Sequence, residues 1–66
     1  MDNKEEIIIK YDRSGQIIVK YYYKNNELHN TDGPAIIEYD ENKNIINQKF
    51  YLNGKQIDEL TILVNI

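Results

Sequence analysis

The chain contains no cysteine and no tryptophan, and it has only one proline and three glycines among its 66 residues. The lack of cysteine excludes disulfides and thiolate-bound metal ions, and it is compatible with a reducing compartment. Three scattered glycines do not form a glycine-rich phosphate loop. No apolar stretch approaches the ~18 residues of a membrane span, and the acidic residues near the start are unlike a basic secretory signal. We therefore expect a cytoplasmic protein without a membrane segment.

The size and charge of the chain limit what it can be. We expect one domain, residues 1–66, because a chain this short buries only about 60% of its unfolded surface and has a marginal core. The formal net charge is -3, with acidic residues scattered along the chain. Direct nucleic-acid binding is disfavoured, since it needs a basic face. An acidic surface could instead dock on a basic site of a protein partner, or serve solubility alone.

The sequence nearly repeats itself at an offset of 28 residues. Residues 8–25 read IIKYDRSGQIIVKYYYKN and residues 36–53 read IIEYDENKNIINQKFYLN, with eight identical positions. Each copy contains two segments rich in β-branched and aromatic residues, separated by a polar turn. A duplicated strand–turn–strand unit is typical of small repeat proteins built from hairpins, which usually present surfaces and seldom perform chemistry.

Alternating and β-branched segments predict the strands. Asn53-Gly54 is the strongest hairpin signal, and Gly33-Pro34 interrupts the connection between the two copies. Apolar residues alternate in the tail, which we interpret as a last strand; a short helix beginning near Asp58 is the alternative. The fold class is therefore all-β, a single antiparallel sheet of about five strands at residues 5–12, 16–24, 35–40, 45–52 and 59–66.

Two short motifs resemble a known family. Residues 28–35 (LHNTDGPA) and 49–55 (KFYLNGK) are similar to the LHxxDGPA and YYxNGK motifs of MORN-repeat variants from bacterial, phage and giant-virus proteins. The first copy departs from this pattern, with Asn26 where the second has Gly54. The resemblance implies two MORN-like β-hairpins plus a C-terminal strand, serving as an interaction module. Some bacterial relatives in that family are antitoxin-like, which implies neutralisation of another protein.

Few residues could carry chemistry. His29 and Asp32 could form an oriented base, but the only serine, Ser14, lies in the first turn and no nucleophile motif surrounds the pair. One histidine without cysteine is a poor metal-ligand set, and residues 40–42 lack the ligand pattern of a calcium loop. We expect no catalytic residue, no cofactor and no metal. Asp32 is expected to cap the Gly33-Pro34 turn.

Tyrosines are the candidate binding residues. Tyr21 and Tyr23 share one face of a strand, and the aromatics Tyr22 and Phe50 are expected in the core. Tyr21 corresponds to Lys49 in the second copy, so it is expected to be the most exposed aromatic and an interface anchor. The alternative is a cross-strand packing ladder. The predicted protein-binding residues are Tyr21, Tyr23, Asp40 and Glu41, with the two acids forming a guiding rim.

Apolar residues on both faces of strands 5–12 and 59–66 indicate a surface that a second subunit or a target must cover, so we expect a homodimer. The predicted function is a non-enzymatic protein-binding module. It would act as a small inhibitor or antitoxin-like protein that blocks a toxin or a defence enzyme by surface occlusion, as a phage-encoded anti-defence protein would. A self-assembling structural protein and a dimeric small-molecule or nucleotide-sequestering protein are the alternatives.

Overall fold

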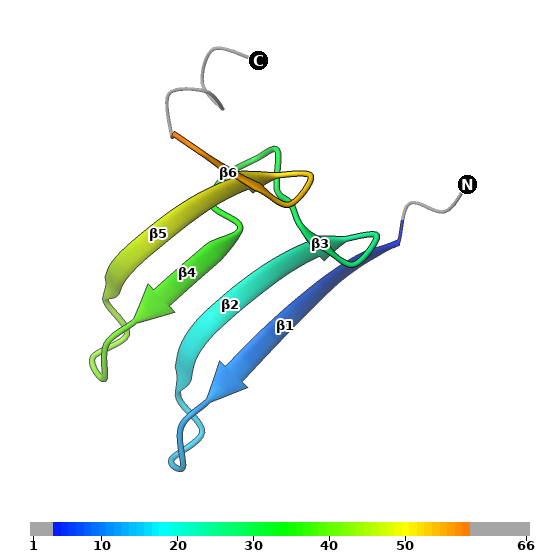
Figure 1. Cartoon of the computed structure of the whole chain (residues 1–66). Helices are drawn as coiled ribbons and strands as arrows, with labels where there is room; N and C mark the ends of the chain where they lie inside the picture. The colour runs from blue at the N-terminus through cyan, green and yellow to red at the C-terminus, as the bar shows by residue number, and fades with distance from the viewer. Residues whose placement is uncertain (1–3, 59–66) are drawn as a thin grey trace.

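The computed structural model describes residues 4–58, which form one antiparallel β-sheet (Figure 1). The strands pair in the order β1-β2-β4-β5-β6, and β3 pairs with β2. Their bounds are β1 (Glu5–Tyr11), β2 (Ile17–Lys24), β3 (Glu27–Leu28), β4 (Ile36–Tyr39), β5 (Ile45–Leu52) and β6 (Lys55–Ile57). No helix in this part of the chain is long and apolar enough to cross a membrane.

The predicted all-β class and single antiparallel sheet are confirmed. The strand list differs, because two short strands, β3 and β6, follow the tight turns at residues 25–26 and 53–54. All four central turn residues have positive φ, which lets each turn reverse the chain directly into a short return strand. The predicted last strand, residues 59–66, lies outside the described residues.

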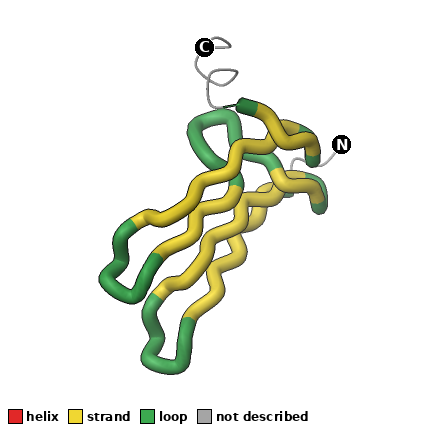
Figure 2. Tube along the Cα trace, turned by 60° about the vertical axis from the view of Figure 1, so that its left-hand side comes forward, coloured by secondary structure: helices red, strands yellow, loops and turns green. Residues whose placement is uncertain are grey.

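The 28-residue repeat is present in the structure as two matching units, β1–β3 and β4–β6, which lie side by side (Figures 1 and 2). In the first unit, pairing changes register between Lys10 and Tyr11, where β2 carries an extra residue, Ile18. In the second unit it changes between Glu38 and Tyr39, opposite an extra Ile46 in β5. The same β-bulge therefore recurs 28 residues on. Each bulge lies next to the turn of its hairpin, where a bulge increases the local strand twist.

The connection at residues 28–35 fastens the first unit to the second. The amide of Gly54 donates to the carbonyl oxygen of Leu28 at 2.8 Å, and the amide of Asn30 donates to the carbonyl oxygen of Tyr51 at 3.2 Å. The amide of Ala35 donates to the carbonyl oxygen of Lys49 at 2.9 Å. The LHNTDGPA segment thus supplies backbone hydrogen bonds that join the two hairpins.

Asn30, and not Asp32, shapes this connection. The Oδ1 atom of Asn30 accepts a hydrogen bond from the Asp32 amide at 3.0 Å, and its Nδ2 donates to the carbonyl oxygen of Pro34 at 2.9 Å. The prediction that Asp32 caps the turn is therefore wrong. An amide side chain can donate and accept together, which a carboxylate cannot, and only such a group bridges both ends of this turn.

The buried core is small and lies where β2, β4 and β5 meet. Val19, Ala35 and Ile36 are its buried apolar residues, at 8%, 0% and 9% exposure. Tyr22 and Phe50, which were expected in the core, are only half-buried. The reason is architectural: within residues 4–58 the sheet is a single layer, so large side chains pack against neighbours on the same face and keep one side in water.

Candidate protein-binding surface

Tyr21 and Tyr23 form an aromatic pair on β2. They share a face, as the alternation of a strand requires, with ring centroids 6.3 Å apart and planes inclined by 38°. Lys10 on β1 adds a charge, because its Nζ lies 5.6 Å from the centroid of the Tyr21 ring, within cation–π range. Both tyrosines are half-buried. The pair is therefore partly accessible to solvent, with the exposed Lys10 beside it.

Tyr21 is not the most exposed aromatic, contrary to the sequence-based expectation. That residue is Tyr11, at 56% exposure. Tyr21 lies in a strand with neighbours on both sides, opposite Ile8 on β1 and Ile36 on β4. Tyr11 lies at the end of the edge strand β1. Tyr11 and Tyr39 are counterparts in the repeat, but within residues 4–58 β1 lies at the end of the strand order, whereas β4 lies between β2 and β5.

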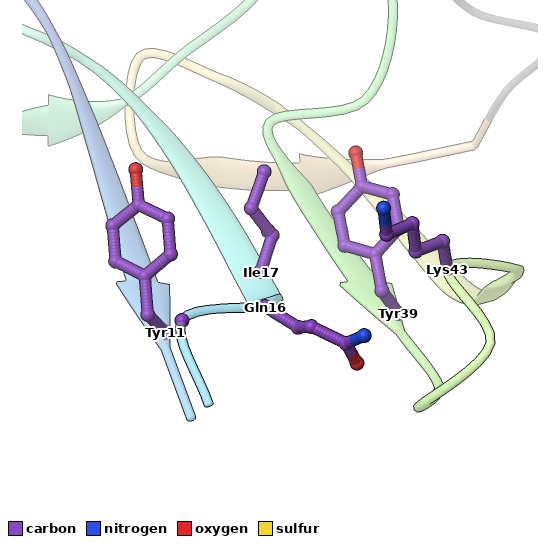
Figure 3. Close-up of a pocket in the computed structure, with 6 residues that line it drawn as sticks. Tyr11, Gln16, Ile17, Tyr39 and Lys43 are labelled. Carbon is purple, nitrogen blue, oxygen red and sulfur yellow. The ribbon is translucent and has the colours of Figure 1, made fainter. Parts of the chain in front are cut away.

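A hollow of about 350 Å³ lies between the two hairpin turns (Figure 3). Tyr11 from β1, Ile17 from β2 and Tyr39 from β4 point in the same direction into this region. Its walls are completed by Gly15, Gln16 and Lys43. The volume is within the range of small-ligand and side-chain pockets, and an ammonium group lies at one end. Sequence reasoning missed this site, which exists because side-by-side packing of the units brings the repeated tyrosines to the same end of the sheet.

Asp40 holds its own turn. Its Oδ1 atom accepts hydrogen bonds from the amides of Asn42 at 2.8 Å and Asn44 at 2.9 Å. These backbone donors, Asn44 first, favour the charged carboxylate and lower the pKa of Asp40 below its usual 3.8. Glu41 beside it is exposed. Of the two predicted rim acids, Asp40 is thus occupied in shaping the turn, and Glu41 is the side chain more open to solvent.

Asp12 plays the same part in the first unit. Its Oδ1 atom accepts from the Ser14 hydroxyl at 2.7 Å, the Ser14 amide at 2.9 Å and the Gln16 amide at 3.0 Å. The Ser14 hydroxyl is the main reason that the pKa of Asp12 is lowered from 3.8, with the Gln16 amide next. The Tyr-Asp dipeptide shared by the two copies therefore encodes a turn closed by an aspartate.

His29 connects the two units. Its Nδ1 atom accepts a hydrogen bond from the backbone amide of Asn53 at 2.9 Å. Its own backbone amide donates to the carbonyl oxygen of Tyr22 at 3.0 Å. With Asp32 it also lines a hollow of about 420 Å³ beside the start of β1. Among residues 4–58, no group of three or more histidine, cysteine, aspartate or glutamate side chains is arranged to hold a metal ion. The contacts of His29 are those of a structural residue.

Comparison of the chain with protein-family models, with curated proteins and with solved structures gave no match. What the protein binds must therefore be inferred from its own surface. Membership in the MORN-repeat family, which residues 28–35 and 49–55 suggest by their resemblance, stays a prediction.

Proposed function

We propose that this protein is a non-enzymatic protein-binding module that acts by covering a surface of its partner. The observation that carries this proposal is the distribution of tyrosines on a single-layered sheet. Tyr11 is 56% exposed, Tyr39 faces the same hollow, and Tyr21 and Tyr23 form a half-buried pair. Tyrosine is a common energetic anchor of protein interfaces, because it offers a large apolar ring and one polar group at a small entropic cost.

The hollow between the turns would receive a side chain of the partner. Tyr11 and Tyr39 would contact an apolar or aromatic group there, while Lys43 would pair with a polar or acidic atom at the margin. The exposed Glu41 and the net charge of -3 would favour approach to a basic surface. Inhibition by this route needs no reacting group, since occupation of the surface is enough.

Within this class, a small inhibitor or antitoxin-like protein fits best. The target would be a toxin or a defence enzyme in the cytoplasm, and a phage-encoded anti-defence protein would act in the same way. The resemblance to MORN-repeat variants supports this choice, because the implied relatives include antitoxin-like interaction modules. Residues 28–35, which carry part of that resemblance, join the two hairpins and so hold the tyrosines in place.

Capture of a partner by the immobilised protein, followed by calorimetric titration of the identified partner, tests the proposal. We expect one stoichiometric protein partner, and we expect Tyr11→Ala to raise its dissociation constant by at least about tenfold. The control is Lys55→Ala, which removes an exposed side chain from β6 and should leave the affinity unchanged.

Failure would have a clear form. No protein partner, or equal affinities for Tyr11→Ala and the native chain, would contradict the proposed surface. A metabolite released on denaturation of the purified protein would favour the small-molecule or nucleotide-sequestering function, for which the hollow of about 350 Å³ would be the binding site.

A further inference from the structure

Within residues 4–58, the outer edge of β1 is unpaired. β1 is the terminal strand of the sheet and is seven residues long, with the sequence EEIIIKY. Ile7 and Ile8 lie on opposite faces of this strand and are 58% and 44% exposed. Among the described residues, no strand pairs with this edge. A long, regular edge with exposed isoleucines is one that proteins normally cover, because its unpaired backbone groups are a template for another strand.

Hydrogen-bond alternation determines which backbone groups of β1 are free. The amide of Asn25 donates to the carbonyl oxygen of Lys4 at 2.8 Å, so the backbone groups of Lys4 point toward β2. In an antiparallel pair every second residue repeats this direction, and therefore Glu6, Ile8 and Lys10 also point toward β2. The amide and carbonyl groups of the odd-numbered residues, among them Ile7, point away from the sheet.

We propose that this edge binds β1 of a second copy of the chain, antiparallel, with the two-fold axis at Ile8. Ile7 of one copy then lies opposite Ile9 of the other, and both offer outward amide and carbonyl groups, which form a hydrogen-bonded pair. Ile8 lies opposite Ile8 of the second copy. The bulge inserts its extra residue into β2, so β1 stays regular and can pair along its whole length.

Charge selects this register. Glu6 of each copy lies opposite Lys10 of the other, so two opposite-charge pairs form by symmetry. They occupy non-hydrogen-bonded positions, where side chains approach most closely. Centring the pair on Ile7 would place Lys4 opposite Lys10, and centring it on Ile9 would place Glu6 opposite Asp12. Both neighbouring registers therefore carry like-charge pairs, which destabilise a sheet.

The existing contacts of these residues leave them available. Among residues 4–58, Glu6 forms one loose ion pair, with Lys4 at 4.0 Å, and both side chains are exposed. Lys10 covers the Tyr21 ring from the same face of the sheet. Glu6, Ile8 and Lys10 share that face with Tyr21 and Tyr23, and a two-fold axis normal to the sheet keeps it continuous across the junction. Dimerisation would thus place two tyrosine pairs on one extended face.

Sedimentation equilibrium of the purified full chain tests this pairing. We expect a mass of twice 7.9 kDa at high concentration and dissociation on dilution. Glu6→Lys or Lys10→Glu alone creates two like-charge pairs, so the dimer dissociation constant should rise by about tenfold to a hundredfold. An equimolar mixture of the two variants should recover association, because each heterodimer again has two opposite pairs. The double variant should dimerise as the native chain does.

The control is Glu41→Lys, the same charge change on an exposed residue of the distant turn, which should not alter the dimer. A native chain that stays monomeric at high concentration would overturn the pairing. So would a dimer that both single variants leave unchanged, which would assign association to another surface such as residues 59–66. Failure of the mixture to recover association would overturn the register. Self-association is measured on the protein alone, so these outcomes are independent of partner binding.

Discussion

Replacement of Ile36 by valine tests where the core lies. Ile36 is 9% exposed and is flanked in register by Tyr21 on β2 and Lys49 on β5. Ile36→Val removes one buried methylene and keeps the β-branch, so strand propensity is unchanged. The loss of free energy of unfolding should be about 1 kcal/mol, from transfer of one methylene plus a small cavity. For a domain of this size that lowers the melting temperature by about 4–8 °C.

Ile46→Val is the matched control. It makes the same chemical change on the neighbouring strand β5, at a side chain that is 63% exposed, and should cost less than about 0.5 kcal/mol. Both variants are compared with the native chain by urea and thermal unfolding at low protein concentration, with circular dichroism as the signal. If Ile46→Val costs as much as Ile36→Val, the core is not centred on the junction of β2, β4 and β5.

Two further perturbations test the turns and the junction between the units. Donors in the folded turns lower the pKa values of Asp12 and Asp40, so their carboxylates stabilise the fold above pH 3.8, and this contribution is lost as the pH falls through the lower folded values. Asp12→Asn with Asp40→Asn should flatten the acid limb of melting temperature against pH. His29→Ala removes the acceptor of the Asn53 amide and should cost about 0.5–1 kcal/mol, measured by urea unfolding.

Each of these has a contrary outcome. An acid limb as steep in the double asparagine variant as in the native chain would show that other carboxylates govern the acid transition. A urea midpoint unchanged by His29→Ala would mean that water replaces the imidazole at no cost, and the junction would then depend on backbone hydrogen bonds alone.

Local patterns in the sequence were sufficient to predict the four longer strands, β1, β2, β4 and β5. The bounds of β5, Ile45–Leu52, follow from its β-branched and aromatic content, and the turn after it follows from Asn53-Gly54, because both depend on residues close together in the chain. β2 is the counterpart of β5 in the repeat and has the same β-branched and aromatic content, so it was predicted in the same way. Short return strands such as β3 were not predicted, since two residues carry too little periodicity to be recognised.

Exposure could not be predicted in the same way. The sequence alone does not distinguish the exposure of Tyr21 from that of Tyr11. In the structure, Tyr21 has a strand on each side, whereas Tyr11 lies at the end of the edge strand β1. Side-chain burial in a single-layered sheet depends on strand order, which is a non-local property. The hollow between the turns depends on strand order too, because Ile17 and Tyr39 line the same hollow only when the second unit lies beside the first.

The aspartate-closed turns separate the groups that hold the fold from the groups that the proposed binding would use. In each unit, one carboxylate accepts hydrogen bonds from two backbone amides of the turn, and the side chains of Arg13 and Glu41 take no part in these bonds. They differ accordingly: Arg13 in the first turn corresponds to Glu41 in the second, and both are exposed. The two turns thus carry exposed residues of opposite charge at corresponding positions, and substitutions there should change the proposed binding specificity without loss of the fold.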